Sequence, residues 1–252
     1  MLICGYEEEF IIMDTIKIRK RQCELIAHRG LSGLEKENTA AAFIAAGNRK
    51  SYFGCECDIH PTKDGIYVIC HDEDLKRVGD VDIHIHDHTY QELLNYKLVC
   101  DIDKEKKDYF QIVKMSDYIK ICKKYDKYCV IEYKENFTKE QVSEIIKEIK
   151  ELEYLDKVIF ISFYPNPLIY TREILPNQAM QFLIFEYSDK VYDFCKQYNL
   201  GLDSRWDLLT QEIIDKWHDM GQVVNAWTVN DKKRAYKLIR LGIDYITTNI
   251  LE

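Results

Sequence analysis

Short apolar runs alternate with longer amphipathic segments along most of the chain. Each apolar run has the length of a buried strand, and the eight runs lie at residues 24–27, 53–59, 128–132, 158–162, 180–185, 200–203, 222–227 and 244–247. Helix-like segments lie between them, near residues 39–49, 116–125, 138–151, 165–175, 188–198, 210–220 and 231–241. One of these begins with Thr138 and Gln141 in the spacing of a capping box. The pattern predicts a repeated βα unit.

Eight strands separated by helices favour a (β/α)8 TIM barrel of the α/β class. A doubly wound sheet would more often have about five to seven strands. The chain has four prolines and no low-complexity linker, so we expect residues 1–252 to form a single domain. Because the sequence stops just after the last run, we expect residues 1–22 to fold back over the place of an eighth helix.

One connection is much longer than a βα loop requires. About 45 residues separate His71 from the helix that begins near Ser116. The segment is rich in histidine, aspartate and lysine and has few large aliphatic residues. We therefore predict a small insertion over about residues 72–115, on the same face as the βα loops and without a core of its own.

Charge and cysteine content narrow the classes of partner and the compartment. The net charge is −8 and the basic residues are dispersed, which argues against nucleic acid as a partner. No apolar run approaches the length of a membrane span, and the first residues lack the pattern of a secretory signal. Nine irregularly spaced cysteines indicate a reduced, cytoplasmic protein without a stable membrane anchor. The sequence leaves the oligomeric state open.

Side chains that could bind or react stand at the ends of several predicted strands. In a barrel of this kind the carboxyl ends of the strands carry the functional groups, so these side chains are expected at one mouth. They are His28, Arg29, Glu56, Asp58, Glu132, Lys134 and Trp227.

Two carboxylates of the second strand indicate a cation site. Glu56 and Asp58 are two residues apart, so they share one face of an extended segment while Cys55 and Cys57 take the other. Close carboxylates repel unless a cation lies between them. A hard divalent cation, Mg²⁺ or Ca²⁺, with Glu132 as a third ligand, would satisfy this requirement. The alternative is a solvated strand end that pairs with lysine or arginine.

Two histidines follow apolar runs and could transfer protons. His28 precedes Arg29, and His71 precedes Asp72. Histidine takes up and releases protons near neutral pH, so the pair suits general acid and base catalysis. A structural role is the alternative for each. If the substrate is an anion, Arg29 or a bound cation would attract it locally.

Two other metal sites compete with this interpretation. One would combine a flanking cysteine with His71 around Zn²⁺, but thiols and carboxylates alternate on the strand and cannot share one wall. The other would use His84, His86 and His88, which would share one side of an extended segment. A solvated surface strand is the alternative for these three histidines.

Taken together, these residues resemble the glycerophosphodiester phosphodiesterase family over about residues 24–249. The motifs that carry the resemblance are His28-Arg29-Gly30, Glu37-Asn38-Thr39 with Ala42-Phe43, Glu56-x-Asp58, His71-Asp72 with Leu75 and Arg77, Ile131-Glu132-Tyr133-Lys134, Ser162-Phe163, and Ala226-Trp227-Thr228-Val229-Asn230. Each motif alone is weak, whereas their order and spacing together are specific.

The resemblance implies a TIM barrel that hydrolyses small-molecule glycerophosphodiesters to sn-glycerol 3-phosphate and an alcohol with a divalent cation. The family's roles fall on catalytic His28 and His71, metal ligands Glu56, Asp58 and Glu132, phosphate contacts Arg29 and Lys134, and pocket residues Phe163 and Trp227. One histidine would deprotonate a glycerol hydroxyl, giving a cyclic phosphate, and the other would protonate the departing alcohol. The sequence leaves open which histidine does which.

Two positions depart from the family pattern. Lys36 stands where proline commonly precedes Glu-Asn-Thr, and Thr248-Asn249-Ile250-Leu251 stands where Thr-Asp-x-Pro is usual. Neither removes a proposed catalytic group, but both bear on the pocket wall and the alcohol accepted.

Two other functions remain as alternatives. A lysophospholipase D or related phospholipid phosphodiesterase would need an apolar groove and a membrane-binding surface, and the sequence has no amphipathic anchor. A non-catalytic barrel that binds phosphorylated ligands would have no need for a pair of acid and base histidines.

Overall fold

Eight parallel strands close into a barrel in the computed structural model, which describes residues 14–19, 23–100 and 104–252. Each strand pairs with its neighbours in sequence order, and the first pairs with both the last and the second, which closes the ring. The strands are β1 (Glu24–Ala27), β2 (Tyr52–Pro61), β5 (Tyr128–Tyr133), β6 (Val158–Ser162), β7 (Met180–Ile184), β8 (Gly201–Arg205), β9 (Val224–Trp227) and β10 (Tyr245–Thr248).

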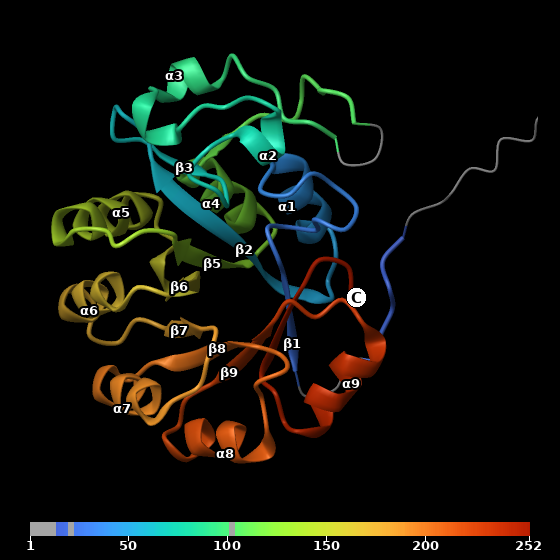
Figure 1. Cartoon of the computed structure of the whole chain (residues 1–252), viewed down its shortest axis with the longest axis vertical. Coiled ribbons are helices and arrows are strands. Elements are labelled where there is room, and N and C mark those ends of the chain that lie inside the picture. Colours follow the sequence, from blue (N-terminus) through green and yellow to red (C-terminus); the bar gives the residue numbers. More distant parts are fainter. Residues whose placement is uncertain (1–13, 20–22, 101–103) are drawn as a thin grey trace, which may run out of the picture.

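Helices surround this barrel on the outside (Figure 1). They are α1 (Ala40–Gly47), α4 (Met115–Lys124), α5 (Lys139–Glu151), α6 (Pro165–Ile174), α7 (Asp189–Tyr198), α8 (Gln211–Asp219) and α9 (Lys232–Arg240). The predicted (β/α)8 architecture is confirmed, and every predicted strand and helix lies within two residues of its expected ends. Thr138 and Gln141 form the predicted capping box of α5.

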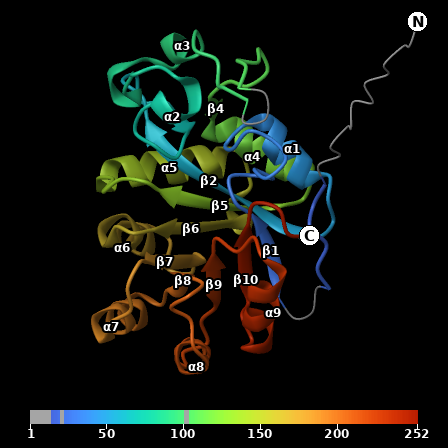
Figure 2. The ribbon, with the colours of Figure 1, turned by 45° about the vertical axis from the view of Figure 1, so that its right-hand side comes forward.

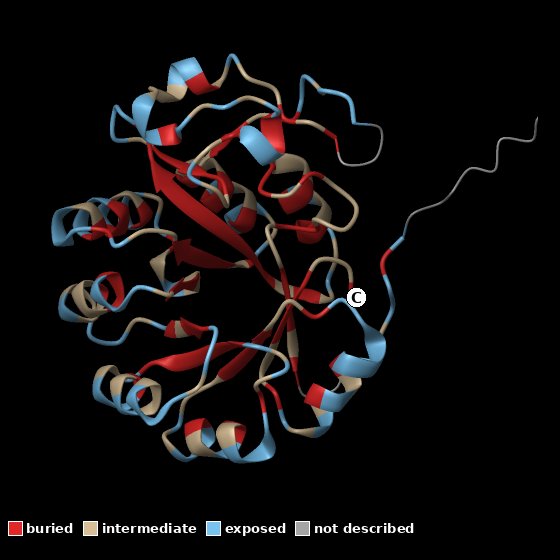
Figure 3. Cartoon of the chain, viewed as in Figure 1, coloured by how far each residue is buried: buried red, intermediate tan, exposed pale blue. Residues whose placement is uncertain are grey.

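Most buried apolar side chains fill the space between the strands and the helices (Figure 3). Cys55 and Cys57 belong to this layer and are fully buried. They are therefore directed away from the barrel interior, as strand alternation predicted. A smaller apolar cluster is formed by Ile26, Val130, Ile159, Ile161 and Leu183.

The insertion is an antiparallel extension of the sheet. It begins before the predicted residue 72, because strand β3 (Tyr67–Ile69) already pairs with the end of β2, and β4 (Val113–Lys114) pairs with β3. The short helices α2 (Lys76–Gly79), η1 (Ile85–Asp87) and α3 (Tyr90–Leu93) lie between these strands.

The insertion also has an apolar cluster that the sequence analysis did not expect. The buried members are Val68, Cys70, Leu75, Val78, Ile85, Leu93, Leu98, Cys100, Phe110 and Ile112. They are spread without a regular period among polar residues, so hydrophobic patterning does not reveal them. The expectation that this segment lacks a core of its own was wrong.

Residues 14–19 run beside the end of the sequence. Ile16 pairs in parallel with Leu251, and its amide donates to the carbonyl of Ile250 at 2.9 Å. This part of the predicted N-terminal segment therefore lies near the last strand (Figure 2), and the rest of residues 1–22 is outside the described residues. Among the described helices, none combines the length and the apolar character that crossing a bilayer requires.

Candidate active site

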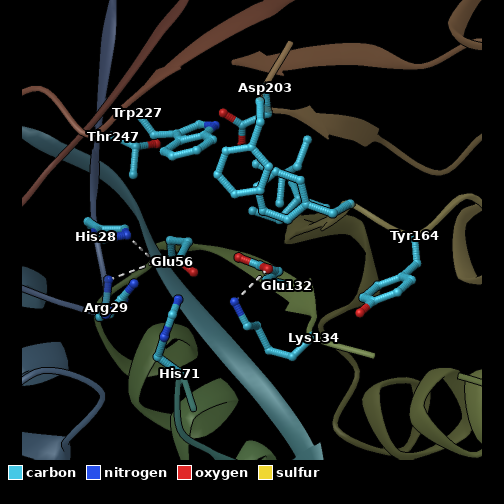
Figure 4. Close-up of a pocket in the computed structure, with 14 residues that line it drawn as sticks. His28, Arg29, Glu56, His71, Glu132, Lys134, Tyr164, Asp203, Trp227 and Thr247 are labelled. Atoms are coloured by element: carbon cyan, nitrogen blue, oxygen red, sulfur yellow. Dashed lines mark hydrogen bonds and ion pairs between the residues drawn. The ribbon is translucent and has the colours of Figure 1, made fainter. Parts of the chain in front are cut away.

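A cavity of about 490 Å³ lies at the carboxyl ends of the barrel strands, beside the residues predicted from the sequence to be functional. Figure 4 shows side chains from several strands converging on it. The lining residues are His28, Arg29, Glu56, His71, Glu132, Lys134, Ile161, Phe163, Tyr164, Leu183, Phe185, Asp203, Trp227 and Thr247. Eight of the nine residues singled out from the sequence are in this set. The ninth, Asp58, is buried beside Lys134 and Arg29.

Glu56, Asp58 and Glu132 form a compact group, named here the carboxylate cage. The first two come from β2 and the third from the adjacent β5, where Asp58 and Glu132 are paired in register. One oxygen of each lies within 4.8 Å of the others, and all three residues are buried. The sheet register therefore brings together side chains that are more than seventy residues apart in sequence.

Burial and mutual repulsion act strongly on the pKa values of the cage. Burial, and then the charge of Asp58, raises the pKa of Glu132 to about 7 and raises that of Glu56 well above its ordinary value. Burial would also raise the pKa of Asp58, but Lys134 and Arg29 overcome this and hold it below its usual range. Without a cation, the cage therefore retains protons near neutral pH.

The cage fits a divalent cation. Glu56 Oε1 is buried and has no hydrogen-bond partner among the described residues. Such an oxygen is costly unless it is protonated or coordinates a cation. Three carboxylates within 4.8 Å of one another supply only oxygen ligands, which is the donor set of Mg²⁺ and Ca²⁺.

Two basic side chains border the cage. Lys134 Nζ lies 2.9 Å from Glu132 Oε1 and 3.4 Å from Asp58 Oδ1. Arg29 Nε lies 3.4 Å from Asp58 Oδ2, and the Arg29 amide donates to Glu56 Oε2 at 2.8 Å. Both cations also line the cavity, so they could contact an anionic group bound there.

A left-handed turn after β1 presents the Arg29 amide to the cage. Arg29 has a φ of 56° and Gly30 a φ of 74°. A Cβ atom at Gly30 would lie 2.6 Å from the carbonyl carbon of Ala42. Only glycine accommodates both this φ and this approach to α1.

His28 is held through the nitrogen that is farther from the cage. Its Nδ1 lies 2.7 Å from Asn249 Oδ1. An amide oxygen only accepts hydrogen bonds, so Nδ1 carries the proton in this arrangement. Nε2 is left with a lone pair and lies 4.0 Å from Glu56 Oε2. Burial, and then the charge of Arg29, lowers the pKa of His28 to about 4, so the ring is neutral at pH 7.

Asn249 was missed as a functional residue by sequence reasoning. It was noted only as a departure from the family pattern in the pocket wall. The contact with His28 joins residues that are 221 positions apart, and β10 next to β1 brings them together. The unusual residue at a motif position was the available signal.

His71 is held by a carboxylate. Its Nδ1 lies 2.6 Å from Asp72 Oδ1, while Arg77 Nε donates to Asp72 Oδ2 at 2.6 Å. Arg77 also donates to Glu37, and hydrogen bonds from Arg77 and Arg29 hold the pKa of that glutamate at about 2 despite its burial. Burial lowers the pKa of His71 as well. In Figure 4, the rings of His28 and His71 approach Glu56 from two different elements.

An aromatic wall faces these polar groups. Phe163 and Phe185 stack with their ring centroids 4.3 Å apart. The Trp227 ring meets both edge-on, at 5.8 Å and 5.5 Å. Phe163 and Trp227 were predicted to line the pocket. Phe185, which follows β7, was not, because nothing in the apolar run around it indicates a place at the cavity.

Asp203 is a buried acid that sequence reasoning also missed. It lies on β8 and lines the cavity. Burial, and then the charge of Glu132, raises its pKa well above the ordinary value. Its Oδ1 has no hydrogen-bond partner among the described residues. A polar residue at the end of an apolar run was the signal in the sequence.

Neither of the two rival metal sites considered from the sequence is formed by the described residues. Among the described residues, the groups that could hold a metal contain no cysteine. His84, His86 and His88 do not converge either, because the segment turns through η1, and His88 Nδ1 contacts the backbone carbonyl of His84 instead. Alternating polar and apolar residues predict an extended segment here, whereas residues 85–87 form a 3₁₀ turn.

Comparison with known proteins agrees with this geometry. The model of the glycerophosphoryl diester phosphodiesterase family matches residues 28–252. The chain belongs to this family. A glycerophosphodiester phosphodiesterase from Bacillus altitudinis is 26% identical over 234 residues, which are 90% of this chain and 94% of the relative. The protein is therefore an enzyme that hydrolyses phosphoric diesters.

Solved structures of the family share the barrel. An Oleispira antarctica phosphodiesterase in complex with the product sn-glycerol-3-phosphate has a TM-score of 0.82 and 25% identity, covering 90% of this chain and 92% of that one. A glycerophosphodiester phosphodiesterase from Thermotoga maritima has a TM-score of 0.73 and 26% identity, covering 92% of this chain and 96% of that one.

Proposed function

We propose that this protein hydrolyses glycerophosphodiesters to sn-glycerol 3-phosphate and an alcohol. The main observation behind this proposal is that two histidines, two basic side chains and the carboxylate cage border one cavity. A phosphodiester is a stable anion, so its hydrolysis needs charge neutralisation, an activated nucleophile and a protonated leaving group. The Oleispira antarctica relative, whose product is sn-glycerol-3-phosphate, supports the same reaction here.

The carboxylate cage would hold Mg²⁺ or Ca²⁺. A divalent cation there would supply positive charge for the phosphoryl oxygens and for a bound hydroxyl group. Its binding requires the loss of protons from Glu56 and Glu132, whose pKa values are raised.

Arg29 and Lys134 would bind the phosphate. Both are cationic at neutral pH and both line the cavity. Each is already paired with a cage carboxylate, which holds its side chain in position. Substrate would thus meet donors that need little reorganisation.

The hydrogen-bond partners of the histidines suggest their roles. His28 is neutral with a free Nε2 lone pair, which suits a general base. Its Nε2 would accept the proton of the neighbouring glycerol hydroxyl while that oxygen attacks phosphorus. His71 faces the carboxylate of Asp72, which opposes the lowering of its pKa by burial and would stabilise an imidazolium, so it suits the general acid.

His71 would give its proton to the alcohol oxygen as the bond to phosphorus breaks. The product of this step is a cyclic glycerol phosphate. Water would then open the ring with the two roles exchanged, which restores both protonation states. Phe163 and Trp227 would form the wall beside the alcohol portion of the substrate.

The aromatic wall favours one second candidate, a lysophospholipase D activity. Phe185 and Tyr164 lie at the cavity and are 56% and 43% exposed. Exposed aromatic side chains beside a phosphate site could receive part of an acyl chain. This reaction would use the same histidines and carboxylates on a larger substrate.

One assay separates these functions. The full chain is incubated with glycerophosphocholine, glycerophosphoethanolamine, glycerophosphoinositol or a lysophospholipid, with Mg²⁺, Ca²⁺ or chelator. Chelator-sensitive release of glycerol phosphate supports the first proposal, and choline or ethanolamine release from the lysophospholipid alone supports the second. No turnover of any substrate would reject both and leave the non-catalytic phospho-ligand barrel.

Matched variants test the histidines. His28→Ala and His71→Ala should each lose about 100-fold or more in kcat. His84→Ala is the control, because His84 is exposed and does not line the cavity. A loss below tenfold in either active-site variant would reassign that histidine to a structural role.

We also propose that the barrel and its insertion act as one catalytic domain in the cytoplasm. The segment that follows β3 carries His71, while the rest of the cavity comes from the barrel. The eight cysteines in the described part of the chain are free and buried, which suits a reducing compartment. Cell fractionation and a single unfolding transition would support these two statements.

A further inference from the structure

We propose that His60, His86 and Glu135 form a second metal site, which takes Zn²⁺ and fastens the insertion to the barrel. The three residues come from separate elements. His60 lies on β2, Glu135 follows β5, and His86 lies in η1 of the insertion. One potential ligand atom of each lies within 4.8 Å of the others. This group is distinct from the carboxylate cage and does not line the cavity.

The donor atoms are already close to coordinating positions. Glu135 Oε1 lies 2.6 Å from His60 Nδ1 and 2.8 Å from His86 Nε2. Zinc bonds to nitrogen and oxygen are about 2.0–2.2 Å long, so tetrahedral ligand atoms lie roughly 3.4 Å apart. The three side chains would have to separate by less than about 1 Å to admit the ion. His86 can make this movement, because its side chain is 41% exposed.

The chemistry of the set selects the metal. Two imidazole nitrogens and one carboxylate oxygen match the ligands of zinc sites with an open fourth position. Mg²⁺ and Ca²⁺ prefer oxygen ligands only, so the two sites of this protein would discriminate between cation types. The partial exposure of Glu135 and His86 allows a water molecule to complete the coordination.

The outer contact of His60 supports this assignment. Its Nε2 lies 3.4 Å from the backbone carbonyl of His71. In the structure Nδ1 faces Glu135 Oε1 at 2.6 Å and therefore carries a proton. Zinc binding would displace this proton, and a proton on Nε2 would then be directed toward the His71 carbonyl. Metal-binding histidines commonly present their second nitrogen to a carbonyl or carboxylate in this way. His60 is buried, with 3% of its surface exposed, so its ring is fixed before any ion arrives.

The zinc site would connect the insertion to His71, one of the two histidines of the active site. His86 tethers η1 to β5 through Glu135, and His60 contacts the backbone of His71. Zinc would therefore stabilise the docked position of the insertion. This inference does not rest on the proposed reaction, because it concerns metal binding outside the cavity.

The test measures zinc binding to the full, metal-free chain by calorimetry and Co²⁺ absorption spectroscopy. A Glu56→Gln background weakens the carboxylate cage, so that binding at the second site is observed separately. In this background we expect one zinc per chain and visible Co²⁺ bands typical of nitrogen ligation. His86→Ala should weaken zinc binding by at least about 100-fold, more than the loss of an outer contact costs.

Glu135→Gln distinguishes a metal site from a simple hydrogen-bonded contact. The amide keeps the size of the carboxylate and one oxygen that can accept hydrogen bonds from both imidazoles, but it is a poor zinc ligand. Zinc should raise the melting temperature of the Glu56→Gln protein, because it would stabilise the docked insertion. We expect Glu135→Gln to abolish this rise. His84→Ala, the control in the same segment, should retain it. Equal zinc binding by His86→Ala, Glu135→Gln and the parent would overturn the proposal, as would no zinc binding by the parent.

Discussion

Replacing Asn249 by aspartate changes the charge beside His28 with little change in side-chain shape. Asn249 Oδ1 lies 2.7 Å from His28 Nδ1 and is neutral. An aspartate in the same place presents an oxygen with negative charge. The substitution therefore tests whether the neutral partner keeps His28 unprotonated.

The magnitude follows from the distance between the charges. Two unit charges about 4 Å apart attract by about 4 kcal/mol at an effective dielectric constant of 20. Desolvation of the new carboxylate offsets part of this attraction. We expect the pKa of His28 to rise from about 4 by about one to three pH units. At a pKa of about 6, only about a tenth of the His28 rings would be neutral at pH 5.

The assay is an NMR titration of the histidine ring protons in metal-free protein. A His28→Gln variant assigns the resonance, and Asn249→Ala removes the hydrogen bond without adding charge. Asn249→Asp should move the His28 midpoint upward, and Asn249→Ala should not. In the glycerophosphodiesterase assay, Asn249→Asp should lose activity at pH 5 more than at pH 8. An unchanged midpoint, or an equal rise in Asn249→Ala, would refute the reasoning.

Three other predictions address the active site and the fold. Asp72→Asn removes the carboxylate that stabilises protonated His71, and kcat should fall at least about tenfold while substrate affinity changes little. The pKa of Glu132 is raised to about 7, so protons compete with the cation as the pH falls through 7. Calorimetry should therefore show weaker Mg²⁺ or Ca²⁺ binding at pH 6 than at pH 8. Equal affinities at the two pH values would contradict the proposed cation site. Gly30→Ala forces a Cβ to within 2.6 Å of Ala42, so urea denaturation should show a loss of at least about 1 kcal/mol in unfolding free energy.

Part of the candidate site could be predicted because the information is local. Strand alternation places Glu56 and Asp58 on one face, and barrel geometry places residues after each strand at one mouth. The end of the third predicted strand placed Glu132 and Lys134 at the same mouth, and the family motifs added their roles. Their positions relative to one another were confirmed, while the catalytic and ligand roles stay predictions.

The residues that support the site could not be predicted in this way. The local signals at Asn249 and Asp203 mark an unusual position but not a function, and Phe185 has no such signal. Each acquires its significance from a neighbour on another strand, such as His28 beside Asn249. Long-range contacts of this kind depend on barrel closure and on the register of the pairing strands.

The sequence by itself determined the order of strands and helices, because hydrophobic periodicity and helix caps act within a few residues. It also determined which side of β2 carries acids and which carries thiols. Only the tertiary structure decided that His86 joins His60 and Glu135 rather than His84 and His88. The physical reason is that a 3₁₀ turn and the docking of the insertion, rather than spacing along the chain, set which side chains meet.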